Sequence, residues 1–90
     1  MTPPHLSLED TLCSKVRLRI LKLLDGSQKL TPSEIAAKLG TNYVLARIHL
    51  EVLVGAGVLT RADFGKRIRY YRFKESTRAL AVKNFIEAWR

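Results

Sequence analysis

The sequence predicts a small α+β fold that is mainly helical, with three helices, a two-stranded hairpin and a C-terminal helix. Three observations support this prediction. Apolar residues recur every three or four positions up to about Gly57, which is the helical period, and alternate with polar residues from Val58 to Phe73. Gly26 and Gly40 stand where helical patterns end. With 90 residues, the chain is expected to form a single domain, residues 1–90.

The first helix is predicted from Leu8 to Asp25, with Ser7 as its N-cap and Gly26 just beyond its end. Lys15, Arg19 and Lys22 occupy its polar face. Its apolar face consists of Leu8, Leu12, Val16, Ile20, Leu23 and Leu24. This arrangement is typical of an amphipathic helix on a small core.

The second and third helices are predicted to follow each other closely. Thr31 caps the second, Pro32 occupies its first position, and Glu34 completes a capping box. Gly40 ends this helix, and Thr41 or Asn42 caps the next, which runs to Gly55 or Ala56. The inward stripe of the third helix is Ala46, Leu50 and Leu53. Two helices joined by a short turn containing Gly form a helix-turn-helix unit.

Two strands and a last helix complete the chain. Val58–Arg61 is the expected first strand, Asp63–Lys66 the turn and Ile68–Phe73 the return strand. Ser76 or Thr77 caps the last helix, which is predicted to reach Arg90. The order of elements is that of a winged helix-turn-helix domain, with the hairpin as the wing.

The net charge of the chain indicates the kind of partner it binds. Sixteen Lys and Arg against eight Asp and Glu give a net charge of +8, which favours a polyanion: nucleic acid first, an anionic membrane surface second. No apolar run has the ~18–20 residues of a membrane span. The start shows no secretory signal, and the single cysteine, Cys13, forms neither an internal disulfide nor a thiolate cluster. We therefore expect a cytoplasmic, DNA-associated protein without cofactor or metal.

A family resemblance rests on several segments taken together. The segments that carry it are Arg17–Leu24, Thr31–Ala36 with Leu39–Gly40, His49–Leu53 with Ala56–Leu59, Gly65–Arg67 and Tyr71–Phe73. Between about Leu12 and Phe73, the chain resembles ArsR-type and related archaeal winged-helix transcription regulators. The resemblance implies a homodimeric DNA-binding regulator whose third helix is the recognition helix. Paired cysteines, which metal-sensing members carry on that helix, are absent here, so metal sensing at that position is not expected.

The recognition helix provides the first set of candidate DNA contacts. With Ala46, Leu50 and Leu53 facing inward, its outward residues are expected to be Tyr43, Val44, Arg47, Ile48 and Glu51. Arg47 can pair with guanine, Tyr43 can reach a phosphate or stack, and Val44 or Ile48 can touch a thymine methyl group. The alternative is that Val44, Leu45 and Ile48 are extra core or interface. Asn42, Thr31 and Ser33 are expected near the DNA backbone at the helix starts.

The wing provides the second set. Between Arg61 and Lys74 the chain has a single acid, Asp63, and six basic residues: Arg61, Lys66, Arg67, Arg69, Arg72 and Lys74. Of these, Lys66, Arg67, Arg69 and Arg72 are the predicted contacts to phosphates or the minor groove. The alternative is a solvated strand edge that its charge protects from aggregation. Tyr71 and Phe73 are expected in the core, and His49 is expected to be packed.

The last helix carries the predicted dimer interface: Ala79, Val82, Phe85, Ile86 and Trp89. The apolar surface of these residues exceeds what the core of one small domain can cover. Residues 7–74 are therefore expected to form the winged-helix body, and residues 75–90 a dimerisation helix. The alternative is that this helix folds back on its own domain.

The function expected from these residues is a dimeric DNA-binding transcription regulator. Its recognition helix enters the major groove of double-stranded DNA, and its basic wing lies on the backbone or in the minor groove. Two alternatives remain: a docking subunit of transcription, replication or division machinery, and a non-specific chromatin or RNA-binding protein. An enzyme is not expected, because no paired carboxylates, nucleophile–base pair or phosphate loop is present. A small-molecule effector is left open.

Overall fold

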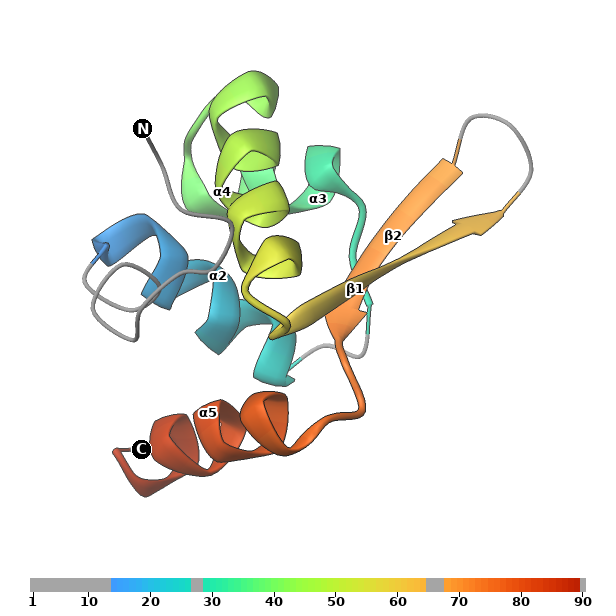
Figure 1. Cartoon of the computed structure of the whole chain (residues 1–90). Helices are drawn as coiled ribbons and strands as arrows, with labels where there is room; N and C mark the ends of the chain where they lie inside the picture. The colour runs from blue at the N-terminus through green and yellow to red at the C-terminus, as the bar shows by residue number, and fades with distance from the viewer. Residues whose placement is uncertain (1–13, 27–28, 65–67, 90) are drawn as a thin grey trace, which may run out of the picture.

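The computed structural model describes residues 14–26, 29–64 and 68–89. Within these ranges the elements are α2 (Lys15–Gly26), α3 (Pro32–Leu39), α4 (Tyr43–Gly55), β1 (Leu59–Phe64), β2 (Ile68–Phe73) and α5 (Thr77–Ala88). This order confirms the predicted winged helix-turn-helix fold. In Figure 1 the two strands project to one side of the helices, and α5 lies across the end of the molecule remote from α3.

The first helix predicted from the sequence is interrupted at Ser14. α2 begins at Lys15, and Ser14 precedes it outside the helix. The Ser14 hydroxyl group accepts a hydrogen bond from the backbone N–H of Arg17 over 3.3 Å. It therefore caps the first turn of α2, where this N–H has no carbonyl partner within the helix. The predicted helix is therefore not continuous through Ser14, while its predicted start at Leu8 and the predicted cap Ser7 lie outside the described residues.

The predicted caps at both ends of α3 and at the start of α4 are confirmed. The backbone N–H of Thr31 donates to Glu34 Oε1 over 2.9 Å, and that of Glu34 donates to Thr31 Oγ1 over 3.2 Å. These two bonds are the reciprocal capping box. Gly40 ends α3 with a φ of 69°, a left-handed conformation that suits glycine. Asn42 Oδ1 then accepts from the N–H of Leu45 over 2.8 Å and caps α4.

The first wing strand extends further toward the wing tip than predicted, to Phe64 instead of Arg61. β1 and β2 pair antiparallel, with Leu59 opposite Phe73, Asp63 opposite Arg69 and Phe64 opposite Ile68. The predicted turn from Asp63 is therefore wrong. Because hairpin connections need only 2–5 residues, the chain can keep Asp63 and Phe64 in the ladder.

The segment before α3 also joins the sheet. Leu30 and Tyr71 exchange two backbone hydrogen bonds, over 3.1 and 2.8 Å, in an isolated bridge. This bridge fixes the N-terminal side of α3 against β2, on the side of β2 away from β1. The segment that leads into the helix-turn-helix unit is thus attached to the wing by backbone hydrogen bonds.

One hydrophobic core holds these elements together. Its largest fully buried side chains are Tyr71, Ile20, Leu21, Ile35, Leu50, Leu53, Leu59 and Val58. Leu21 replaces Leu23 as a fully buried residue of the first helix; Leu23 is only partly buried. The core unites α2, α3, α4 and the base of the wing, so α4 and the wing have a common support.

The last helix packs on the same core. Ser76 Oγ accepts from the N–H of Ala79 over 3.2 Å and donates to the Gly57 carbonyl over 3.2 Å. Arg78 donates to the Ala56 carbonyl over 2.8 Å, which ties the start of α5 to the end of α4. The helix ends at Ala88, two residues before the predicted Arg90.

Candidate nucleic-acid interface

The outward face of α4 is apolar and open to solvent. The exposed fractions are 46% for Tyr43, 65% for Val44, 39% for Leu45 and 54% for Ile48. The inward stripe of Ala46, Leu50 and Leu53 is fully buried. The reading of Val44, Leu45 and Ile48 as core residues is therefore wrong for this chain, and these side chains remain available to a partner.

Polar groups border this apolar face. Arg47 is exposed and, within the described part of the chain, makes no hydrogen bond or ion pair. Asn42 Oδ1 and Thr31 Oγ1 are engaged in capping α4 and α3, whereas Ser33 is exposed in the first turn of α3. Among the predicted contacts in the two helices, Arg47 thus presents the charged group most available to a ligand.

Glu51 connects α4 to the wing. Its Oε1 lies 3.1 Å from Arg61 Nη1 of β1, and its Oε2 accepts a hydrogen bond from the Tyr71 hydroxyl group over 2.5 Å. Burial raises the pKa of Tyr71, and the bond to Glu51 raises it further, while Arg69 opposes this shift. Sequence reasoning placed Glu51 on the outward face of the helix but missed this pairing, since the partners lie 10 and 20 residues away.

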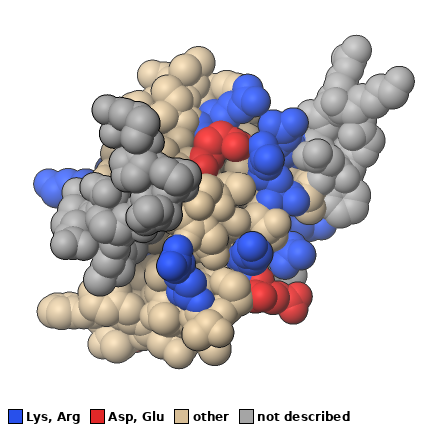
Figure 2. Space-filling view, in the orientation of Figure 1, with Lys and Arg blue, Asp and Glu red and all other residues tan. Residues whose placement is uncertain are grey.

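The basic residues of the wing divide between two sides of the molecule: Arg61 pairs with Glu51 of α4, whereas Arg72 and Lys74 line hollows beside the end of α2 and the start of α5. Arg61 and Lys74 are exposed, and Arg69 and Arg72 are partly buried. Figure 2 shows Lys and Arg side chains concentrated where the wing leaves the body. Lys66 and Arg67, the predicted contacts at the wing tip, lie outside the described residues.

Three aromatic residues of β2 have distinct surroundings. Tyr71 is fully buried and Phe73 partly buried against the core, as predicted. The Lys29 ammonium group lies 4.9 Å from the centre of the Tyr70 ring, a cation–π distance. Lys29 adds a cation beside the wing that sequence reasoning missed, because it comes from the segment before α3.

His49 lies on the side of α4 that faces α2. Its Nδ1 accepts a hydrogen bond from Arg17 Nε over 3.2 Å, which links α4 to α2. Burial lowers the pKa of His49, and the positive charge of Arg17 lowers it further. The prediction of a packed histidine is confirmed.

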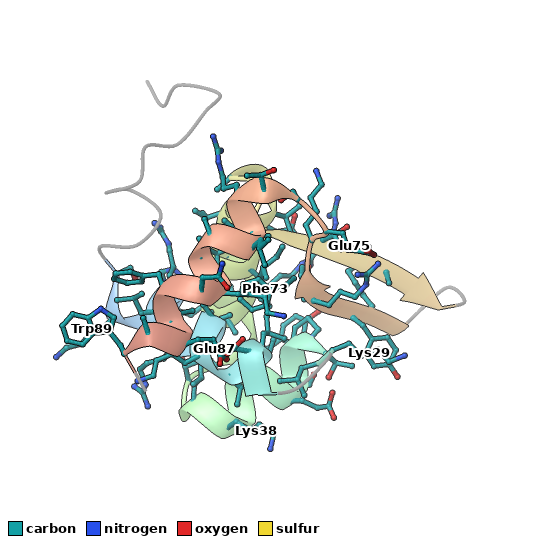
Figure 3. The ribbon with its side chains drawn as sticks, turned by 90° about the horizontal axis from the view of Figure 1, so that it is seen from below. Lys29, Lys38, Phe73, Glu75, Glu87 and Trp89 are labelled. Atoms are coloured by element: carbon teal, nitrogen blue, oxygen red, sulfur yellow. The ribbon has the colours of Figure 1, made fainter. Side chains whose placement is uncertain are left out.

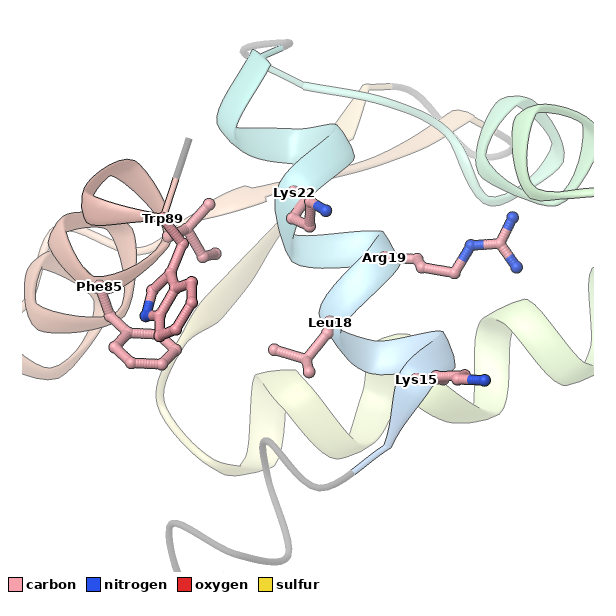
Figure 4. Close-up of a pocket in the computed structure, with 7 residues that line it drawn as sticks. Lys15, Leu18, Arg19, Lys22, Phe85 and Trp89 are labelled. Atoms are coloured by element: carbon pink, nitrogen blue, oxygen red, sulfur yellow. The ribbon is translucent and has the colours of Figure 1, made fainter.

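A groove of about 480 Å³ runs between α2 and α5. It is lined by Lys15, Leu18, Arg19, Lys22, Phe85, Ile86 and Trp89. In Figure 4 the rings of Phe85 and Trp89 lie together on one side of α2, and Arg19 and Lys15 project on the other side. The surface is therefore aromatic on the α5 side and basic on the α2 side.

The predicted dimer residues divide into two groups. Ala79, Val82 and Ile86 are 0%, 7% and 5% exposed, since they pack on the core of their own domain. Phe85 and Trp89 are 50% and 80% exposed, and Figure 3 shows Trp89 projecting from the end of α5. Of the five residues, these two remain open to a second copy.

Residues 14–26, 29–64 and 68–89 contain no group of three His, Cys, Asp or Glu side chains that could hold a metal ion. Cys13 lies outside these ranges. No helix among the described residues has the length and apolar character needed to cross a membrane.

Comparison with protein families gives one match over most of the chain. Residues 5–83 match the model of the O-methyltransferase dimerisation domain. None of the curated proteins compared with this sequence matches it.

Several solved structures have a fold similar to that of this chain. The antimony-specific transcriptional repressor AntR superposes with a TM-score of 0.76 at 25% identity, over 88% of this chain and 67% of that one. A homodimeric winged helix-turn-helix DNA-binding domain from Mycobacterium bovis, a possible ArsR-family transcriptional regulator, gives 0.74 at 24%, over 88% and 70%. The adhesin competence repressor of Streptococcus pyogenes gives 0.74 at 20%, over 90% of this chain and 60% of its own length. These structures confirm the predicted winged-helix fold, which the chain shares with a transcriptional repressor and with a possible ArsR-family regulator.

Proposed function

Because the chain belongs to the O-methyltransferase dimerisation domain family and has the fold of winged-helix transcriptional repressors, we propose that it is a homodimeric DNA-binding transcription regulator. The outward face of α4 enters the major groove, which accepts one helix. The basic wing lies along the backbone or in the minor groove. No catalytic role is proposed.

The observation that carries this proposal is the position of Glu51. It binds Arg61 and Tyr71 and so holds the exposed face of α4 beside the wing cations. Its own negative charge is paired with Arg61 and would repel phosphates less than a free carboxylate. With a net charge of +8, the chain is suited to a polyanion.

Within this function, the DNA contacts have separate roles. Lys66, Arg67, Arg69 and Arg72 bind phosphates and supply affinity that does not depend on sequence. Arg47 reaches a base edge from the face of α4, with Tyr43 beside it. Asn42, Thr31 and Ser33 lie at the helix starts, where backbone N–H groups favour phosphates.

The proposed dimer forms through residues 75–90 and α2. Phe85 and Trp89 are the exposed anchors, and the groove beside Leu18 receives the second copy. The similar M. bovis domain is homodimeric, which supports a second copy of the chain as the partner. A symmetric pair would present two α4 helices to half-sites roughly 34–36 Å apart.

The test is a fluorescence titration of two duplexes, one selected from random sequence and one scrambled, at two salt concentrations. Arg47→Ala is expected to cost ~1–3 kcal/mol on the selected duplex and much less on the scrambled one. Arg67→Ala should weaken both alike and reduce the salt slope by about 1. Lys83→Ala, which removes one charge from α5, is the control and should leave selectivity unchanged. Equal losses on both duplexes for Arg47→Ala would leave a non-specific binder.

A second candidate is a pairing or docking module without DNA. It is favoured by the family match, whose model describes a dimerisation domain, and by the apolar character of the exposed α4 face. Apolar docking depends little on salt, whereas DNA binding weakens steeply from low to physiological salt. A wild-type protein that binds neither duplex at low salt would support this second function.

A further inference from the structure

We propose that Val44 and Ile48 read the C5-methyl groups of thymines, so that the preferred half-site is thymine-rich opposite the N-terminal half of α4. This inference rests on the proposed DNA-binding function and specifies the DNA that the same face recognises. It assigns sequence readout to apolar contacts, with Arg47 as a polar neighbour.

The first step is the geometry of the outward row. Val44, Ile48 and Glu51 are spaced i, i+4 and i+7, which places them along one face of α4. Val44 and Ile48 are the most exposed apolar residues of the helix, at 65% and 54%. Glu51, the third member, is held by Arg61 and Tyr71. The part of the row that is left for a ligand is therefore purely aliphatic.

The second step is the chemistry of the major groove. Its floor presents hydrogen-bond donors and acceptors on every base pair, and a single apolar group, the C5-methyl of thymine. Aliphatic side chains pressed against guanine, cytosine or phosphate oxygens would remove polar atoms from water without giving them a partner. Thymine methyl groups are the feature that this row matches.

The third step is the surroundings of the row, which favour DNA over an apolar protein surface as its occupant. Arg47 lies beside Ile48 on the same helix, and the Arg61 and Arg69 side chains belong to the adjoining wing. Glu51, the acid within the row, is paired with Arg61, so these two charges offset each other and Arg47 and Arg69 remain as the cations at its border. An aliphatic strip bordered by cations complements a groove whose floor carries methyl groups and whose walls carry phosphates.

The experiment uses the duplex obtained by selection from random sequence and the same duplex with thymines replaced one at a time by uracil. Uracil keeps base pairing and removes only the methyl group. Wild-type protein should bind about fourfold more weakly for each contacted thymine replaced, the fold-change for ~0.8 kcal/mol per buried methyl-sized group. Restoring the methyl group as 5-methylcytosine paired with guanine should recover part of the affinity relative to cytosine at that position.

The matched variants identify the side chains. Val44→Ala and Ile48→Ala should bind the thymine and uracil duplexes equally well at the positions they read. Leu45→Ala, on the flank of the same helix, should retain the wild-type preference. All three side chains are exposed, so each variant should keep the wild-type circular dichroism spectrum and melting temperature within a few degrees.

The outcomes separate this inference from the function beneath it. Wild-type protein that binds no duplex at low salt overturns the proposed function, and this inference with it. Protein that binds the selected duplex but does not distinguish thymine from uracil overturns the methyl readout alone. A thymine preference that persists in the Val44→Ala Ile48→Ala double variant also overturns it.

Discussion

The Tyr71 hydroxyl group donates a hydrogen bond to the Glu51 carboxylate over 2.5 Å and thereby joins the wing to α4. Arg61 binds the other carboxylate oxygen over 3.1 Å, so both strands of the wing are attached to one side chain of α4. The angle between wing and helix decides whether both can meet one duplex. Glu51 is thus a positioning residue for the proposed interface.

Tyr71→Phe is expected to lower the free energy of unfolding by about 1.5–3 kcal/mol, the usual value of a hydrogen bond to a charged group. The ring stays in the core, while Glu51 loses a donor. Urea denaturation measures the change. Tyr43→Phe is the control, because Tyr43 is exposed and has no hydrogen bond among the described residues. The free energy of unfolding of this variant should equal that of the wild type. Equal, small effects for both variants would mean that the Tyr71–Glu51 contact does not stabilise the fold.

The difference between what could and could not be predicted follows from sequence separation. Thr31 and Glu34 form a capping box three residues apart, so the sequence predicts it directly. Glu51 and Tyr71 lie 20 residues apart, and no local pattern reports that the helix and strand bring them together. At Ser14, a hydroxyl that caps the helix interrupts an apolar period that otherwise runs on from Leu8.

For the candidate site, the sequence predicts which helix face is buried but not which molecule covers an apolar face. The helical period of Ala46, Leu50 and Leu53 fixes which face of α4 is buried, and so the exposed position of Val44 and Ile48 follows. An apolar stripe does not say which molecule covers it. Ala79, Val82 and Ile86 belong to such a stripe, and their own domain covers them, while Phe85 and Trp89 stay open.

His49 is expected to titrate below 6.5, because burial and the charge of Arg17 both disfavour its protonated form. The stability that this neutral histidine contributes is fully present above pH 6.5 and is lost as the pH falls through the folded-state pKa. NMR titration of the imidazole carbon-bound protons measures the value, and His49→Gln assigns the signal. Arg17→Met should bring the pKa closer to 6.5, without full recovery because burial is the larger cause.

An imidazole pKa above 6.5 in the wild-type protein would contradict the hydrogen bond as drawn. In that bond Nδ1 accepts from Arg17 Nε, which requires an unprotonated Nδ1. The stability of His49→Gln should also change less between pH 7.5 and pH 5 than that of the wild type.

The capping box should make the fold sensitive to acid. Hydrogen bonds from the backbone N–H and the side chain of Thr31 lower the pKa of Glu34 below 4.5. The stability from this carboxylate is therefore present above pH 4.5 and lost as the pH falls through the lower folded-state pKa. Urea denaturation at pH 7 and pH 3 should show a smaller pH dependence for Glu34→Gln, whose amide oxygen can still accept the bond.

The control for this prediction is Glu75→Gln. Glu75 is exposed and makes no hydrogen bond in the described part of the chain, so its replacement should leave the pH dependence as in the wild type. If Glu34→Gln and Glu75→Gln lose stability in acid to the same extent, the capping carboxylate has no special part in acid denaturation.

Trp89→Glu is expected to convert the proposed dimer to a monomer. Trp89 is 80% exposed beside Phe85, at the end of a groove that its own domain leaves open, and a carboxylate there would have to be buried in the interface without a hydrogen-bond partner. Light scattering at micromolar concentration gives the mass of each species. Leu80→Glu is the matched control: Leu80 is 57% exposed on the same helix but does not line this groove, so the variant should remain dimeric. Replacing Ile86 would not make this distinction, because it is 5% exposed and its loss would destabilise the monomer itself. A wild-type protein that is monomeric at this concentration would overturn the dimer, and a dimer that survives Trp89→Glu would move its interface away from the groove between α2 and α5.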